Sequence, residues 1–147
     1  MNKEMVVKLY YGSIIKKLDR GPDIMDITND LSFILEESAI LYGSLSATVI
    51  GSTGSITTIE YEEGVVEDLK DAIKRLAPED AFYRHELKWH DGNGHSHVQA
   101  ALIGPSITIG VRNGRLNLGT WQQVVLINHD NKPRERKVDV TIIGLGA

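Results

Sequence analysis

The chain has 147 residues, of which 41% are hydrophobic and 24% charged, a size and composition typical of one compact globular domain. Sixteen basic against twenty acidic residues give a net charge of −4 at pH 7, which argues against a diffuse basic surface for nucleic acid. The sequence contains no cysteine, which excludes disulfides, thiolate metal ligands and a cysteine nucleophile.

The apolar residues form no run long enough to cross a membrane, and the first 20 residues contain several lysines but no signal-peptide core. We therefore expect a single domain over residues 1–147, no membrane partner, no nucleic-acid partner and a cytoplasmic location.

The first expected element is a strand or hairpin over residues 5–17, which are rich in β-branched and aromatic side chains. A helix follows, because Asp23, Asp26 and Thr28 offer caps and apolar residues then recur at helical spacing. Gly43 is its expected stop.

Two strands, 45–50 and 56–61, flank the turn 51–55 in the expected structure. An amphipathic helix is then predicted from Gly64 to Pro78, because its apolar residues recur on one face and its opposite face is charged.

No helix is expected after residue 80. Short β-rich pieces between turn signals are instead found at 96–103, 105–112, 115–118, 121–128 and 135–144. Asn113-Gly114 is the strongest hairpin signal. Two helices in the N-terminal half followed by strands predict an α+β fold, β-sandwich-like, with a mainly antiparallel sheet.

Four of the five histidines, His85, His90, His95 and His97, fall within 13 positions. In a strand, residues two apart point to the same face about 7 Å from each other, so His95 and His97 would face one ion. A third ligand from His85 would leave a coordination position open. The competing interpretation is a chance pattern of surface imidazoles, and a structural role is favoured for His129.

Asp91 and Asn93 lie in a glycine-containing turn directly before this pair of histidines. Their first role is turn formation, since both side chains bond local backbone. In a functional role, Asp91 could orient a histidine or carry a proton. The spacing leaves both roles open.

The loop around Ser52 and Thr53 is small and hydroxyl-rich, as a phosphate-binding backbone nest would be, although a plain hairpin loop fits equally well. Glu60 begins an acidic stretch in which only some side chains can face a pocket. Arg134 and Arg136 belong to the one basic cluster, which could bind a phosphate or simply protect a strand edge.

Three segments make the chain similar to a known family: Asp91-Gly92-Asn93-Gly94-His95-Ser96-His97, Leu118-Gly119-Thr120-Trp121-Gln122 and Arg134-x-Arg136. They resemble the YjbQ-like family, whose members are often named secondary thiamine-phosphate synthase. The resemblance runs over nearly the whole chain. It implies a compact α+β fold with a β-sandwich core, assembled as a homotrimer with polar sites near subunit boundaries.

The residue patterns and the resemblance together give the expected division of roles. Metal binding falls to His85, His95 and His97; catalysis to Glu60, Asp91 and Asn93; substrate binding to Ser52, Thr53, Trp121, Gln122, Arg134 and Arg136. The implied cofactor is a divalent metal, zinc or similar. One departure stands out, because many family members carry His-Thr-Thr-Ala where this chain has Gly51-Ser52-Thr53-Gly54.

The activity implied by the resemblance joins a hydroxymethylpyrimidine pyrophosphate to a thiazole phosphate and releases pyrophosphate. Such chemistry requires groups that stabilise a departing diphosphate. Three functions remain open from sequence: a metal-assisted enzyme acting on phosphorylated small molecules, a metal-dependent hydrolase of another substrate, and a non-enzymatic metal-binding trimer.

Overall fold

The computed structural model describes residues 6–146. Its elements in chain order are β1 (Val7–Leu18), β2 (Asp23–Asp26), α1 (Thr28–Ser38), β3 (Ile40–Val49), β4 (Gly54–Ile59), α2 (Glu63–Leu76), α3 (Glu86–Trp89), α4 (Gly94–Ile103), β5 (Ser106–Arg112), β6 (Arg115–Leu116), β7 (Gln123–Asn128) and β8 (Arg134–Gly146). Residue 5 of the first expected strand lies outside the described residues.

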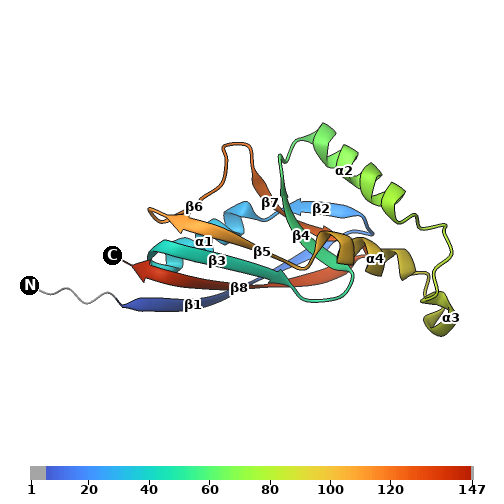
Figure 1. Ribbon diagram of the computed structural model, residues 1–147, viewed down its shortest axis with the longest axis horizontal. Helices are drawn as coiled ribbons and strands as arrows, with labels where there is room; N and C mark the ends of the chain where they lie inside the picture. Colours follow the sequence, from blue (N-terminus) through green and yellow to red (C-terminus); the bar gives the residue numbers. More distant parts are fainter. Residues whose placement is uncertain (1–5, 147) are drawn as a thin grey trace, which may run out of the picture.

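The strands form two antiparallel sheets, one of five strands in the order β1-β8-β3-β5-β6 and one of three in the order β2-β7-β4. Figure 1 shows the five-stranded sheet along the lower side, with α1 and the three-stranded sheet above it and α2 outermost. The expected α+β class with sandwich-like antiparallel sheets is confirmed.

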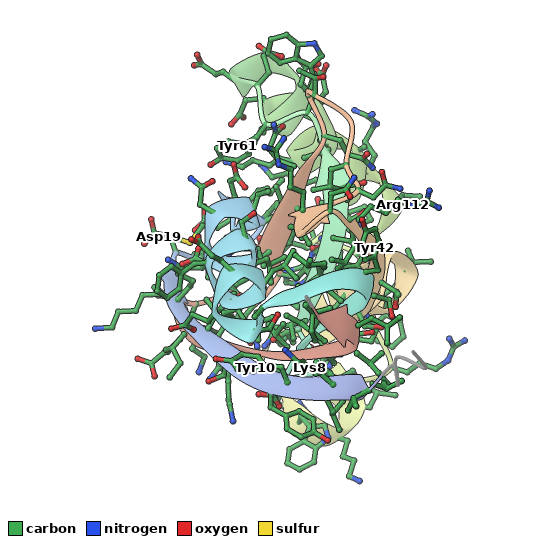
Figure 2. All side chains as sticks on the ribbon, turned by 90° about the vertical axis from the view of Figure 1, so that its left-hand side faces the viewer. Lys8, Tyr10, Asp19, Tyr42, Tyr61 and Arg112 are labelled. Atoms are coloured by element: carbon green, nitrogen blue, oxygen red, sulfur yellow. The ribbon has the colours of Figure 1, made fainter. Side chains whose placement is uncertain are left out.

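The main core lies between the five-stranded sheet, α1 and one face of the three-stranded sheet, and includes Leu31, Leu45, Leu126 and Ile142. In Figure 2, turned by 90°, β1 curves around α1. A second apolar cluster, containing Ile73 and Ile127, joins α2 to the other face of the three-stranded sheet. This sheet is therefore buried on both faces, which explains the uninterrupted apolar sequence of β7.

The helix expected from Gly64 is confirmed as α2. Glu62 precedes it and caps it, because its carboxylate accepts hydrogen bonds from the backbone N–H groups of Gly64 and Val65. These bonds lower the pKa of Glu62.

The expectation of no helix after residue 80 is wrong. The short helix α3 and the ten-residue helix α4 lie there, and α4 occupies the segment 96–103 that was expected to be a strand. Gln99, Ala100 and Leu102 favour a helix. No apolar stripe reveals α4 in the sequence, because several of its buried residues are polar.

Smaller differences concern the ends of elements. The Asn113-Gly114 hairpin is confirmed, with positive φ at both residues (52° and 71°), as a type I′ turn requires. Gly43 stops no helix, since α1 ends at Ser38 and Gly43 lies inside β3 opposite Gly144. A Cβ on Gly43 would lie 2.0 Å from the carbonyl oxygen of Ile143, so glycine is required there by close backbone approach.

No helix within residues 6–146 has both the length and the apolar character needed to cross a membrane.

Candidate functional site

The turn before α4 is held by the carboxylate of Glu86. Its two oxygens accept hydrogen bonds from the backbone N–H groups of Gly92 (2.7 Å) and Gly94 (2.9 Å), and the pKa of Glu86 is lowered, chiefly by the bond from Gly92. A negative charge at the start of a helix is also favourable to the helix dipole. This anchor fixes where the side chains of the first turn of α4 point.

Asn93 joins the start of α4 to the loop after β7. Its Oδ1 accepts hydrogen bonds from the Ser96 hydroxyl and from the backbone N–H of Asn131 (3.1 Å). Asn131 in turn donates from Nδ2 to the backbone oxygen of Asp91 at 2.8 Å. These bonds bring a turn near residue 92 against a loop some forty positions later in the chain.

Arg136 on β8 is a buried cation with neutral partners. Only 6% of the residue is exposed, and its Nε and Nη2 donate to Asn128 Oδ1 at 3.2 and 2.7 Å. Nη2 also donates to the Thr53 hydroxyl oxygen. No carboxylate lies within ion-pair distance of Arg136 in the described chain, and Nη1 has no hydrogen bond there. Burial lowers the pKa of its guanidinium.

The carboxylate of Asp130 lies next to this arginine and is itself almost completely buried. It accepts a hydrogen bond from the Thr53 hydroxyl at 2.9 Å and pairs with Arg134 Nε at 3.1 Å. Burial acts to raise the pKa of Asp130, but the donors Asn93, Thr53 and Arg134 together lower it below its usual value. The aspartate is therefore ionised at neutral pH.

These residues surround a pocket of about 340 Å³. Its lining consists of Ser52, Thr53, Asp91, Asn93, His97, Asp130, Arg134, Glu135 and Arg136. The structure thus brings together three features that lie apart in the sequence. They are the loop with Ser52 and Thr53, the basic residues Arg134 and Arg136, and the turn with Asp91 and Asn93. We refer to this cavity as the Arg136 pocket.

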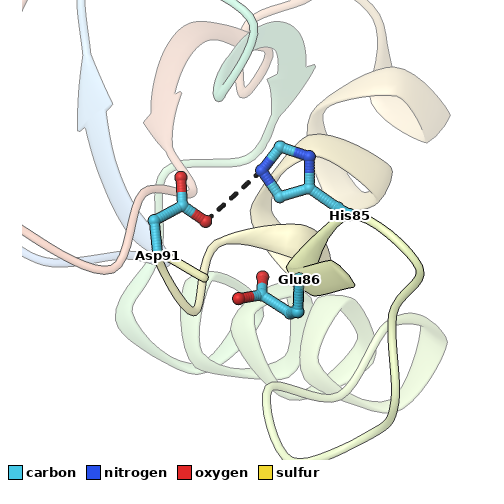
Figure 3. Close-up of side chains that lie close together, drawn as sticks. All are labelled: His85, Glu86 and Asp91. Carbon is cyan, nitrogen blue, oxygen red and sulfur yellow. Dashed lines mark ion pairs between the residues drawn. The ribbon is translucent and has the colours of Figure 1, made fainter. Parts of the chain in front are cut away.

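His85 and Asp91 form an ion-pair contact at the edge of the Arg136 pocket, with Nε2 of His85 3.3 Å from Oδ1 of Asp91 (Figure 3). This nitrogen is buried and makes no aligned hydrogen bond with any described residue. Burial acts to raise the pKa of Asp91, but the backbone hydrogen bond from Asn93 and the neighbouring His85 side chain together lower it. With Glu86, the two residues form a group whose potential ligand atoms lie within 4.8 Å of one another.

The expected metal triad of His85, His95 and His97 is divided by α4. The same-face geometry expected for His95 and His97 is wrong, because residues two apart on a helix point in nearly opposite directions, about 200° apart. His97 lies beside His85, with ring centroids 4.5 Å apart, and lines the Arg136 pocket. His95 is 5% exposed and lines a different cavity.

Glu60, Trp121 and Gln122 lie at the other end of β4 and β7. Ile59 pairs with Gln123 there, whereas Gly54 pairs with Asn128 next to the Arg136 pocket, so the two ends are about 17 Å apart. Glu60 and Trp121 are exposed. The Gln122 amide donates to Thr58 and accepts from the backbone N–H of Gly119. Within the described chain these residues do not join the pocket.

Sequence reasoning missed the polar run of residues 128–131, which supplies partners to Arg136, Thr53 and the turn at Asp91. A signal was present, since the run Asn128-His129-Asp130-Asn131 begins at the last residue of β7, directly after its buried apolar residues. Polar side chains at the end of a buried strand are typical of binding sites held by a rigid scaffold.

The chain matches the family model described as "UPF0047 protein YjbQ-like" over residues 14–145. It is 33% identical over 138 residues to a UPF0047 protein of Methanothermobacter thermautotrophicus, covering 94% of both chains. It is 31% identical to the UPF0047 protein YugU of Bacillus subtilis, covering 87% of this chain and 95% of YugU.

Among solved structures, a YbjQ-like protein of unknown function from Sulfolobus solfataricus P2 superimposes with a TM-score of 0.90 at 33% identity, covering 95% of this chain and 99% of that one. Sequence and fold agree across almost the entire length. The chain therefore belongs to the YjbQ-like UPF0047 family.

Proposed function

We propose that the Arg136 pocket binds the phosphate group of a small molecule and that the protein is a metal-assisted enzyme acting on that molecule. The observation that carries this proposal is the guanidinium of Arg136, which donates hydrogen bonds only to the neutral oxygens of Asn128 and Thr53 and keeps Nη1 without a hydrogen-bond partner among the described residues. The carboxylate of Asp130 lies nearby but is not within ion-pair distance. A buried charge is costly unless it is paired. An anionic ligand would supply the missing partner.

The loop opposite Arg136 leaves room for such a ligand. Gly51 has φ of +122°, and a Cβ at this position would lie 2.7 Å from Nη1 of Arg136. The glycine that replaces the histidine common in the family therefore keeps the space beside Nη1 open. Arg134 and the Ser52 hydroxyl line the same pocket and add a second cation and a further donor for phosphate oxygens.

The neighbouring group of His85, Glu86 and Asp91 fits a divalent cation. The 3.3 Å between Nε2 of His85 and Oδ1 of Asp91 suits two ligands of one tetrahedral ion with bonds of about 2.0–2.1 Å. Nε2 lacks any other hydrogen-bond partner among the described residues, and the lowered pKa of Asp91 keeps it ionised. Glu86 contributes less, because both of its oxygens already accept backbone bonds.

A divalent ion in this position would supply positive charge to phosphate oxygens in the adjoining pocket. Arg134 and Arg136 would orient the anion and stabilise charge that develops on it. Ionised Asp91 can accept a proton or orient His85, and it is unsuited to donate a proton at neutral pH. These roles agree with the phosphorylated substrates implied by the resemblance to thiamine-phosphate synthase.

The proposal includes assembly as a homotrimer. The outer face of the five-stranded sheet exposes large apolar side chains on β1 and β8, namely Val7, Leu9, Tyr11, Ile15 and Ile143. Exposed apolar patches of this kind mark association surfaces. Assembly would also allow the distant Glu60, Trp121 and Gln122 to meet the pocket of another subunit.

Binding of inorganic phosphate tests the anion site. NMR of ¹⁵N-labelled protein without a His tag should show the guanidinium signals of Arg136 shifting on titration with phosphate, while those of exposed Arg112 stay unchanged. Arg134→Gln should lower the affinity for phosphate by about tenfold, whereas the control Arg112→Gln should leave this affinity unchanged. Phosphate that leaves the Arg136 signals unmoved would refute the site.

Metal content and turnover decide between the functions. After dialysis against zinc, the protein should retain stoichiometric metal, His85→Gln should lose it, and His90→Gln, which alters an exposed residue, should keep it. Formation of thiamine phosphate from its two half-molecules would support the transferase, and phosphate release from either one alone would support a hydrolase. Bound metal without either activity would favour the non-enzymatic trimer.

A further inference from the structure

A second cavity, of about 530 Å³, lies on the side of α4 opposite the Arg136 pocket. His95 and Gln99, one helical turn apart, form its wall on α4. The charged residues of its lining are Arg20, Lys74, Glu79 and Asp80. It is larger than the Arg136 pocket, and its lining shares no residue with it. We refer to it as the His95 pocket.

His95, which lines this cavity, has one ring nitrogen without a hydrogen-bond partner in the described chain. The Ser96 hydroxyl donates its proton to Asn93 Oδ1, so at its 3.3 Å contact with Nε2 of His95 it can only accept. The imidazole proton therefore lies on Nε2, and Nδ1 carries a lone pair. Nδ1 is buried and has no partner in the described chain, a state that costs free energy unless a donor is supplied.

The charges of the lining leave one cation and one anion free. Arg20 pairs with Glu79 and also donates from Nε to the backbone oxygen of Asn131. Lys74 and Asp80 take part in no ion pair with any residue from 6 to 146. Gly21, Pro22 and Pro78 complete the lining, and the two prolines have no N–H group to offer.

We propose that the His95 pocket binds a small zwitterion of the α-amino acid class. Its ammonium would supply the donor that Nδ1 of His95 lacks and would be balanced by Asp80, while its carboxylate would pair with Lys74. Such a zwitterion would pair with both the unpaired cation and the unpaired anion of the lining. A simple anion such as phosphate could pair only with the cation. The proposal is independent of the function proposed for the Arg136 pocket.

The standard L-amino acids, each titrated at millimolar concentration into ¹⁵N-labelled protein, provide the probe. At least one should saturate and shift the imidazole nitrogen signals of His95. Its N-acetylated, C-amidated derivative, which carries neither backbone charge, should fail to bind. The proposal is overturned if no amino acid shifts His95, or if the uncharged derivative binds equally well.

Two variants locate the site. His95→Phe keeps a planar ring but removes the acceptor, and should abolish binding. Lys74→Gln alters an exposed residue that the fold does not require and should weaken binding about tenfold, whereas Lys70→Gln, one turn earlier on α2 and paired with Glu67, should not. Unchanged affinity in Lys74→Gln would reject the assignment. Phosphate titration of the same samples reports on the Arg136 pocket separately, so failure of one proposal is distinguishable from failure of the other.

Discussion

Ser55 donates a hydrogen bond to Nε2 of His129 over 2.7 Å, and neither side chain has any exposure to solvent. On the other side of the ring, Nδ1 donates to Oε1 of Gln99 over 3.0 Å, while the amide nitrogen of Gln99 donates to the backbone oxygen of Ala77. The chain of bonds fixes a neutral imidazole with its proton on Nδ1. It also ties α4 to β4 and to the end of β7.

The free energy of unfolding should therefore fall as the pH is lowered from about 6.5 to about 4. Burial, Arg136 and His95 lower the pKa of His129 to about 4 in the folded state, whereas the unfolded chain binds this proton near pH 6.5. The loss should reach about 3 kcal/mol at the lower end, with no contribution above pH 6.5. His95, whose pKa is also lowered by burial, adds to the same trend.

Urea unfolding at a series of pH values measures this dependence. Carboxyl groups with a lowered pKa, such as Asp130, change the free energy of unfolding only below their ordinary pKa near 4. The pH dependence of this free energy above pH 5 therefore comes from the histidines. His129→Gln should flatten the curve, and His90→Gln should leave it unchanged because His90 is exposed. A flat wild-type curve would contradict the prediction.

Gly144→Ala should destabilise the fold by about 3 kcal/mol. Gly144 faces Gly43 across β3 and β8, and a Cβ on Gly144 would lie 2.0 Å from the backbone oxygen of Tyr42. Gly110→Ala is the matched control on β5, because its nearest neighbour would be 3.7 Å away, and it should change stability by about 0.5 kcal/mol or less. Equal unfolding midpoints for the two variants would show that the strands can move apart.

Glu86→Gln should loosen the turn that begins α4. An amide offers only one acceptor oxygen, so one of the two N–H groups of Gly92 and Gly94 loses its partner. Hydrogen exchange at one or both of these amides should become about tenfold faster. Glu67→Gln, which alters an exposed side chain on α2, should leave both amides as they were, and unchanged exchange in Glu86→Gln would show that the anchor is dispensable.

Light scattering at micromolar concentration should give the mass of three chains. Leu9→Glu places a charge on the exposed apolar face of β1 and should produce monomers. Phe33→Glu also replaces an exposed large apolar side chain, but on α1, and should remain a trimer. A wild-type monomer would refute the assembly.

Local patterns in the sequence predicted the elements that bury one regular face. The segment from Gly64 to Pro78 shows an amphipathic repeat and a stop, and α2 follows that pattern. The helix α4 carries no such repeat, because it buries Ser96 and Gln99 in hydrogen bonds with other segments. The strand β2 is only four residues long and has aspartate at both ends, so its apolar pattern is too short to detect.

The candidate site was predictable in its residue types and less so in its geometry. The histidines, Asp91 and the arginines were all visible in the sequence, and most of them do surround one pocket. The sequence did not show which of these residues share a cavity, because His95 and His97 point into different cavities only if their segment is helical. Contacts such as Ser55 with His129 join residues 74 positions apart, and no local pattern carries that information.

Because α4 forms a wall of both cavities, it acts as a shared partition. Its first turn is held by a single carboxylate, and the two histidines that it displays face opposite compartments. A rotation or translation of this helix moves both walls together, so space gained on one side is taken from the other.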